Sequence, residues 1–338
     1  LLFFFGWVFG SHRFLASFLS DFYAPLIAFF EMLALGVIFS CGLFLLRRNV
    51  IQVARFQKPE MKGWASLDGN LILVIEIILM GAILSMNATD QLLQEMSNPA
   101  YPLTGSFLVS SWLMPIFDGY LPSTLVIIER TAWWFHIVGI FGFALYVTYS
   151  KHLHIFMAFP NTYFSKLTPK GAMEPMPEIT SEVKMMLGIP VEVETPPPPE
   201  GFKFGARDVS DLSQKNLMDA YTCTECGRCT AECPANLTGK KLSPRKIMMD
   251  TRDRMEEIGK GRSDAKGHDE KFLLGGFISK EEINACTSCN ACVEACPVLI
   301  NPLDIILQLR RYEAMEASGS PASWNAMFQN VETNAAPW

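Results

Sequence analysis

The stretch YTCTECGRCTAECPANL, residues 221–237, places four cysteines at the spacing C-x2-C-x2-C-x3-C and follows them with a proline. The stretch ACTSCNACVEACPVLI, residues 285–300, repeats both the spacing and the proline. Three cysteines at this spacing let a short turn wrap around one iron–sulfur cube, and the full run is typical of bacterial [4Fe–4S] proteins. Because the run occurs twice, the sequence predicts two [4Fe–4S] clusters.

The fourth cysteine of each run is expected to bind the other cluster, because it stands at the start of the next helix. Structural zinc uses two separated cysteine pairs, and disulfides are rare in a reducing cytoplasm, so both alternatives fit the repeated run less well. Cys41 lies alone in an apolar run and is expected to be a packing residue. The predicted ligands are Cys223, Cys226, Cys229 and Cys296 for the first cluster, and Cys286, Cys289, Cys292 and Cys233 for the second.

The N-terminal half of the chain is apolar, and half of all 338 residues are hydrophobic. A membrane-spanning helix needs roughly 20 apolar residues. Three runs meet this length, at 22–46, 67–87 and 123–149, and residues 1–10 are expected to end a further membrane helix whose start is missing. The net charge of −6 and the absence of a basic stripe argue against a nucleic-acid partner.

The distribution of Lys and Arg predicts the orientation of these spans. No Lys or Arg occurs between Lys62 and Arg130, whereas the loop 47–62 and the segment after the last span are basic. Cytoplasmic loops carry the excess of positive charge in membrane proteins. The pattern therefore predicts a multi-pass protein of the inner membrane, with loop 88–120 outside and the cysteine domain in the cytoplasm.

The predicted fold is all-α, with a transmembrane helical bundle followed by a cytoplasmic helical ferredoxin domain. Helix starts are marked by Ser243 before Pro244, by a Ser279–Glu282 capping box, and by Asn301 before Pro302. Four segments are expected: the membrane part at 1–160, a proline-rich connector at 161–205, the two-cluster domain at 206–320, and a tail at 321–338.

The two runs and the long helical insert between them resemble the helical ferredoxin of heterodisulfide reductase C subunits and of the succinate dehydrogenase iron–sulfur subunit. The stretch WWFHIVGIFGFALYVTYSKHLHIF, leading on to the first run, is similar to bacterial membrane-bound iron–sulfur oxidoreductases. In these proteins a membrane part resembling the gamma subunit of respiratory nitrate reductase is fused to that ferredoxin. This resemblance implies haem b in the membrane part, bound between pairs of histidines.

Three histidines are candidate haem ligands. His136 and His154 are 18 residues apart, so a continuous helix would place them on one face, ~27 Å apart along its axis. This separation suits two b haems stacked across a membrane. His12 is expected near the outer surface, where it could complete the outer haem. No histidine earlier in the sequence is expected at the depth of His154 in the membrane. The second ligand of the inner haem therefore lies upstream of residue 1, or the inner haem is absent. The alternative is that SKHLHIF is a basic segment at the membrane surface.

Two carboxylates, Glu31 and Glu76, fall inside predicted spans, where an ionisable group is costly and often functional. Each is expected either to belong to a quinone proton path or to pair with an arginine. The sequence shows no substrate pocket with a nucleophile, so the catalytic site is expected on another polypeptide.

The predicted function is that of a membrane-anchored electron-transfer subunit within a multi-subunit complex. It would pass electrons between the quinone pool and a cytoplasmic iron–sulfur or flavin subunit, with a protein carrying CCG modules as one candidate. The alternative is a haem-free membrane anchor that carries the ferredoxin domain as a docking scaffold.

Overall fold

The computed structural model describes residues 16–190, 203–263 and 271–338. The chain forms two compact units, Leu1–His152 and Leu153–Trp338. Helices make up both units, and in the described ranges no β-strand occurs beyond a single bridge between Leu274 and Ile278. The all-α prediction is therefore confirmed. The helix expected at residues 1–10, and the candidate ligand His12, lie outside the described residues.

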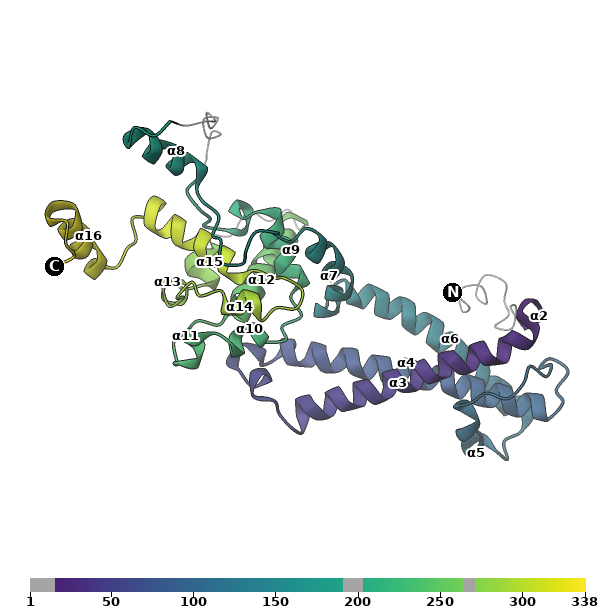
Figure 1. The fold of residues 1–338 in the computed structure, drawn as a ribbon. Coiled ribbons are helices and arrows are strands. Elements are labelled where there is room, and N and C mark those ends of the chain that lie inside the picture. Colours follow the sequence, from purple (N-terminus) through teal and green to yellow (C-terminus); the bar gives the residue numbers. More distant parts are fainter. Residues whose placement is uncertain (1–15, 191–202, 264–270) are drawn as a thin grey trace. The chain divides into compact units, whose positions relative to one another are not determined.

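Three long helices build the first unit: α3 (Tyr23–Asn49), α4 (Trp64–Glu95) and α6 (Pro122–Val147). Each is long and apolar enough to cross a membrane, which confirms the three predicted spans. Helix α4 packs against both α3 and α6 (Figure 1). Short helical elements make up the rest of the unit: Ala16–Leu19, Ser20–Phe22, Ala54–Phe56, Pro59–Met61, Ser110–Trp112 and Met114–Phe117.

Helix α4 continues to Glu95, beyond the end expected at residue 87. Its last turns are polar but buried, because the loop that follows folds back over them. The side-chain oxygen of Gln94 accepts a hydrogen bond from the backbone N–H of Thr104 at 2.9 Å, and that of Gln91 accepts one from Phe107 at 3.2 Å. Polar side chains thus hold the loop against the end of the helix.

The expected continuous helix through His136 and His154 is wrong. Helix α6 ends at Val147, and a 3-10 turn, Lys151–Leu153, precedes the next helix. Asp68, at the start of α4, accounts for the break: its carboxylate accepts hydrogen bonds from the Ser150 hydroxyl at 2.8 Å and from the Lys151 backbone N–H at 3.1 Å. These bonds hold the chain in a turn where a helix would otherwise continue.

Helix α7 (His154–Tyr163) belongs to the second unit, where it packs against α9 (Gln214–Thr222). Asn161 donates to the backbone carbonyl of Val298 at 2.9 Å and accepts from Lys215 at 3.0 Å. The boundary between the units therefore lies at 152/153 rather than at 160. The segment expected as a connector also contains a helix, α8 (Pro177–Met186), with proline in its first turn.

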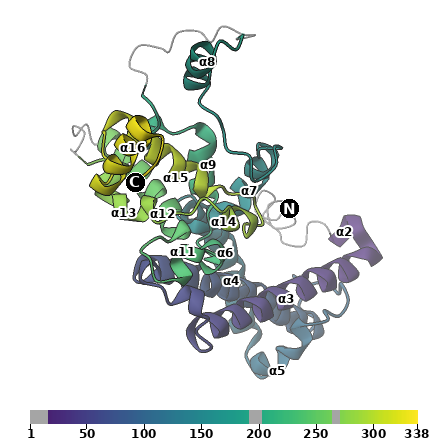
Figure 2. The ribbon, with the colours of Figure 1, turned by 60° about the vertical axis from the view of Figure 1, so that its left-hand side comes forward.

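The remaining helices of the second unit are shorter than α12 (Pro244–Ser263), which packs against α9, α10 (Arg228–Ala231) and α15 (Pro302–Arg311) (Figure 2). All three predicted helix starts are confirmed by backbone N–H groups that donate to the side chains of Ser243, Ser279 and Asn301. The other elements are Val209–Asp211, α10 (Arg228–Ala231), α11 (Pro234–Leu237), Leu273–Phe277, α13 (Lys280–Asn284), α14 (Ala291–Glu294), α15 (Pro302–Arg311), Tyr312–Glu316 and α16 (Ala322–Asn334).

An apolar core joins these helices beside the cysteine runs. Its fully buried members come from α12, α15 and the segments near 273–283, and burial of such side chains is the main favourable term in folding. A buried ion pair borders this core, in which Arg254 donates to Asp208 at 2.8 Å. The core members include Ile247, Met248, Leu273, Ile278, Ile283, Ile305 and Ile306.

Candidate iron–sulfur centres and a cavity in the membrane unit

The two cysteine loops follow the same backbone path. The residue two places after the first cysteine has a positive φ in each loop, 59° at Glu225 and 55° at Ser288. Its backbone N–H donates to the sulfur of that first cysteine, from Glu225 to Cys223 and from Ser288 to Cys286, at 3.4 Å in both loops. Such N–H···S bonds stabilise a negatively charged thiolate, as a metal-binding sulfur requires.

A second left-handed residue follows two positions later in each loop. It is Gly227 in the first loop and Asn290 in the second, with φ of 75° and 62°. Glycine and asparagine tolerate this conformation better than other residues. Each then begins a single-turn helix, α10 or α14, and these two helices pack against each other. The sequence repeat is therefore also a structural repeat.

The fourth cysteine of the second run, Cys296, lies near two cysteines of the first run, Cys226 and Cys229. Burial is the main cause that raises the pKa of Cys229 to about 12, and the nearby thiols of Cys226, Cys292 and Cys296 add to the rise. Burial also raises the pKa of Cys296, with Cys226 among its neighbours. Burial raises the pKa of Cys223 as well, and the nearby thiol of Cys229 adds to the rise.

The reverse arrangement holds for the other group. Burial raises the pKa of Cys292 to about 12, and Cys286, Cys233 and Cys289 reinforce it. The pKa of Cys286 is likewise raised by burial, with Cys233 and Cys289 nearby. Cys233 of the first run is thus a neighbour of Cys286 and Cys292 of the second run.

In the described ranges no three His, Cys, Asp or Glu side chains converge on a point that would hold a single metal ion. The cysteine spacing of the two runs fits a [4Fe–4S] cube better than a zinc ion, because structural zinc sites use two separated cysteine pairs. Crowded, buried thiols with raised pKa values are costly as free thiolates. Binding iron would release their protons and offset that cost.

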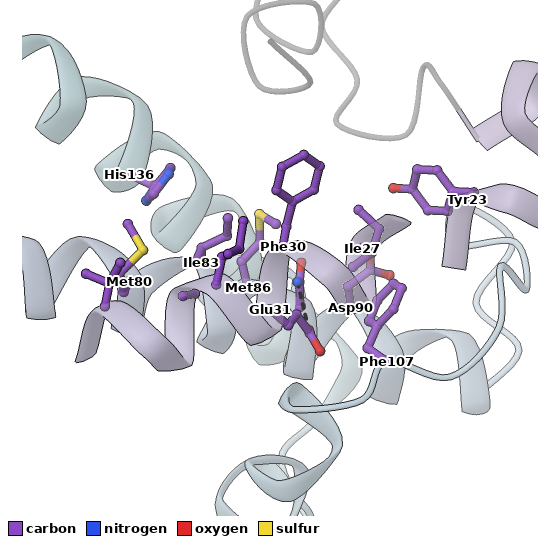
Figure 3. Close-up of a pocket in the computed structure, with 14 residues that line it drawn as sticks. Tyr23, Ile27, Phe30, Glu31, Met80, Ile83, Met86, Asp90, Phe107 and His136 are labelled. Atoms are coloured by element: carbon purple, nitrogen blue, oxygen red, sulfur yellow. Dashed lines mark hydrogen bonds between the residues drawn. The ribbon is translucent and has the colours of Figure 1, made fainter. Parts of the chain in front are cut away.

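Figure 3 shows a cavity of about 270 Å³ in the membrane unit, bounded by α3, α4 and α6. Most of its lining is apolar, but polar side chains point into it from different elements. Glu31 comes from α3, Asp90 from α4 and His136 from α6. Sequence reasoning missed Asp90, whose signal is the polar run NATDQLLQ at the end of an apolar span.

His136 is buried, at 3% exposure, and its Nδ1 lies 2.8 Å from the backbone carbonyl of Leu79. Because a carbonyl only accepts, Nδ1 carries the proton, and a neutral imidazole then keeps its lone pair on Nε2. Metal-binding histidines commonly donate their other ring N–H to a backbone carbonyl in this way. Of the other candidates, His154 starts α7 in the second unit. The cavity lining therefore contains one of the three predicted histidines among the described residues.

Glu31 is 2% exposed and tightly hydrogen-bonded. Its carboxylate accepts from the Asn87 side chain at 2.9 Å, from the Val109 backbone N–H at 2.8 Å, and from both the backbone and the hydroxyl of Ser110. An arginine partner, one of the two expectations, is not found among the described residues. Glu76 is half-buried, and in the same ranges it has no hydrogen bond or ion pair and does not line the cavity.

Replacing Glu31 with alanine should destabilise the membrane unit by about 3 kcal/mol or more. The change would leave the donors of Asn87, Val109 and Ser110 without an acceptor, and each orphaned buried donor costs about 1–3 kcal/mol. Thermal unfolding in detergent, followed by tryptophan fluorescence, measures the loss. Asp21→Ala, at an exposed position, is the control. Equal melting temperatures of the two variants would contradict the stabilising role of the Glu31 hydrogen bonds.

A family model described as a 4Fe-4S dicluster domain matches residues 222–300, which include all eight cysteines of the two runs. The C-terminal unit holds a 4Fe–4S dicluster domain. The iron–sulfur prediction is thereby confirmed at the level of the domain. The pairing of individual cysteines with individual clusters stays a prediction.

Several curated proteins are similar to the whole chain or to part of it. A probable iron-sulfur-binding oxidoreductase, FadF, of Bacillus subtilis is 27% identical over 93% of this chain and 45% of its own length. An EtfAB:quinone oxidoreductase of Syntrophomonas wolfei is 30% identical over 85% of this chain and 41% of its own length. A probable membrane-anchored ferredoxin of Chromohalobacter salexigens is 28% identical over 38% of this chain and 21% of its own length.

The expected likeness to heterodisulfide reductase C subunits is also found, in proteins of methanogens. The relatives are thus iron–sulfur oxidoreductases and electron-transfer proteins. The chain spans less than half the length of the first two relatives. No solved structure matches the chain.

Proposed function

We propose that this chain is a membrane-anchored electron-transfer subunit that connects a quinone in the membrane to a cytoplasmic redox partner. The proposal rests on one observation. The same chain contains a dicluster domain and three membrane-capable helices, and these helices surround a partly polar cavity. The catalytic site for the partner's substrate would lie on another polypeptide of the same complex. A cytoplasmic iron–sulfur or flavin subunit, or a protein with CCG modules, is the proposed partner.

Crossed ligation is the proposed arrangement of the clusters. Cys296 would complete the set that begins with the first run, and Cys233 would complete the set of the second. The thiol neighbours support this assignment, since Cys296 is close to Cys226 and Cys233 is close to Cys286 and Cys292. Each bound [4Fe–4S] cluster would supply one-electron chemistry. The protein would hold the two close together through the contact between α10 and α14.

The membrane cavity is the proposed site for a quinone head group. A quinone presents a flat apolar ring with two oxygens that take up or release protons, and the cavity combines an apolar lining with two carboxylates. Asp90, whose carboxylate accepts from the Gln94 side chain at 3.1 Å, is the candidate proton-transfer group, whereas Glu31 accepts four hydrogen bonds. A relative whose name contains a quinone substrate supports this choice.

His136 is the proposed haem b ligand of this unit, with His12 and His154 as the further candidates. The hydrogen bond from Nδ1 of His136 to the Leu79 carbonyl supports the assignment, because metal-binding histidines are commonly oriented by such a bond. A haem-free anchor is the second candidate. It is favoured by the presence of a single histidine in the described lining of the cavity.

Quinone should reoxidise the reduced clusters through this cavity. We expect full-length protein in lipid nanodiscs, reduced with dithionite and desalted, to lose its cluster EPR signal when a short-chain quinone is added. Asp90→Asn should slow the loss at least about tenfold, because a positioned proton-transfer group contributes about 10²–10⁴-fold. Asp118→Asn is the matched control at an exposed site. Equal rates in both variants would argue against the cavity as the quinone site.

The proposed location is the inner membrane, with the dicluster domain in the cytoplasm. It follows from the basic loop 47–62 and from the absence of Lys and Arg between Lys62 and Arg130. A reporter enzyme that works only in the cytoplasm should be active when it is fused after Lys151. A reporter enzyme that works only in the periplasm should be active when it is inserted near Asn98. The opposite pattern at either position would overturn the orientation.

A further inference from the structure

The two cysteine loops differ in charge at equivalent positions. In the first loop, Glu225 is 2% exposed and forms an ion pair with Arg252 at 2.5 Å. The Arg252 guanidinium also interacts with the thiol of Cys223. The positive charge beside this loop is thus offset by a buried carboxylate that belongs to the loop itself.

In the second loop, the position of Glu225 is taken by Ser288, and a different arginine contacts it. Arg310, from α15, donates to the Ser288 hydroxyl at 3.3 Å and to the Cys286 carbonyl at 2.5 Å. It also donates to the carbonyls of Ile283 and Asn284. All four acceptors are neutral, and no carboxylate pairs with Arg310 in the described part of the chain.

Two other carboxylates near the clusters' thiols are paired with lysines, and Arg228 and Glu232 of the first loop are exposed to solvent. Asp219 lies near Cys296 but forms an ion pair with Lys215 at 2.5 Å. Glu313 shares a cavity of about 370 Å³ with Cys286 and Arg310, but it pairs with Lys280 at 2.6 Å. The charge of Arg252 beside the first loop is therefore offset by a buried carboxylate, whereas no carboxylate pairs with Arg310 beside the second loop in the described residues.

The solvent exposure of the cysteines also differs between the two loops. Cys223 is buried, whereas Cys289 is the exposed member of the eight thiols. Reduction adds a negative charge to a cluster, so a nearby positive charge and access to solvent both raise the reduction potential. Burial without net positive charge lowers it. Both differences favour an electron on the cluster of the second loop.

We infer that the cluster held by Cys286, Cys289 and Cys292 has the higher reduction potential of the two, and that Arg310 and Glu225 set the difference. An electron on the first-loop cluster would then pass to the second, which is reduced as the first is oxidised, with no bond or proton transferred. The exposed Cys289 side is where that electron would leave for a soluble partner. The inference rests on the proposed pair of clusters but not on crossed ligation.

Potentiometric EPR of the full-length protein tests the inference. Two titration steps are expected, and the signal altered in Cys289→Ser identifies the second-loop cluster. In Arg310→Gln the reduction potential of that cluster should fall by at least about 59 mV. For one electron, this changes the distribution of the electron between the two clusters about tenfold. Arg310→Lys should retain most of the potential. Arg311→Gln, whose native side chain donates to the Glu174 carbonyl, is the control.

Glu225→Gln is an independent variant in case the Arg310 substitution prevents folding. It removes the carboxylate of Glu225 that pairs with Arg252, so the reduction potential of the first-loop cluster should rise. The difference between the reduction potentials of the two clusters should then become smaller. Equal potentials in the wild-type protein, or a higher potential for the first-loop cluster, would overturn the inference. Iron content and spin count are measured first, and absence of the clusters would refute the proposed function instead.

Discussion

Cys233→Ser should abolish the cluster of the second cysteine loop and leave that of the first intact. Cys233 belongs to the first run by sequence, but its thiol lies near Cys286 and Cys292. Serine is a much poorer ligand for iron than a thiolate, so the cluster that loses Cys233 would lose its fourth ligand. The iron held in clusters, counted apart from any haem iron, should fall from about eight to about four atoms per chain.

EPR spectroscopy identifies which cluster is lost. The remaining signal should match the one that survives in Cys289→Ser, since both variants would remove a ligand of the same cluster. Cys41→Ser, at the buried cysteine in α3, should retain both clusters. A Cys233→Ser protein whose remaining signal instead matches that of Cys226→Ser would contradict crossed ligation.

His136→Ala should remove one b haem from the membrane unit. The side chain is buried in α6, where an imidazole must satisfy one donor and one acceptor. The Leu79 carbonyl accepts from Nδ1, and iron is the proposed partner of Nε2. Without the imidazole, the haem would lose an axial ligand, and its alpha band should fall by at least half.

His152→Ala is the matched control for this variant. His152 lies in the same unit, where its ring is 5.5 Å from that of Phe143 and does not line the cavity. It should keep the full haem spectrum. Iron bound to the dicluster domain should be unchanged in both variants, which separates haem loss from unfolding. A His136→Ala protein with an undiminished alpha band would refute the assignment and favour the haem-free anchor.

Much of the fold was predictable because its determinants are local. The cysteine spacing acts within a few residues, so each run forms its own turn. Caps such as Ser279 with Glu282 also act within one helical turn. Long apolar runs identify membrane-capable helices by composition alone, and all three described ones were predicted.

The features that the sequence could not predict depend on contacts between distant residues. Asp68 ends the helix at Val147 by binding Ser150 and Lys151, more than 80 positions away. The cavity needs α3, α4 and α6 together, so Asp90 has no signal of its own beyond a polar run. The different charges of the two cysteine loops also arise from arginines on other helices.

The reduced-minus-oxidised optical spectrum of the purified full-length protein in lipid shows whether the membrane unit carries electrons. If the membrane unit carries electrons between a quinone and the clusters, dithionite should produce a b-type alpha band, and an added quinone should abolish it. A protein that binds about eight iron atoms in its clusters but shows no alpha band would contradict the account. The chain would then be an anchor for its dicluster domain.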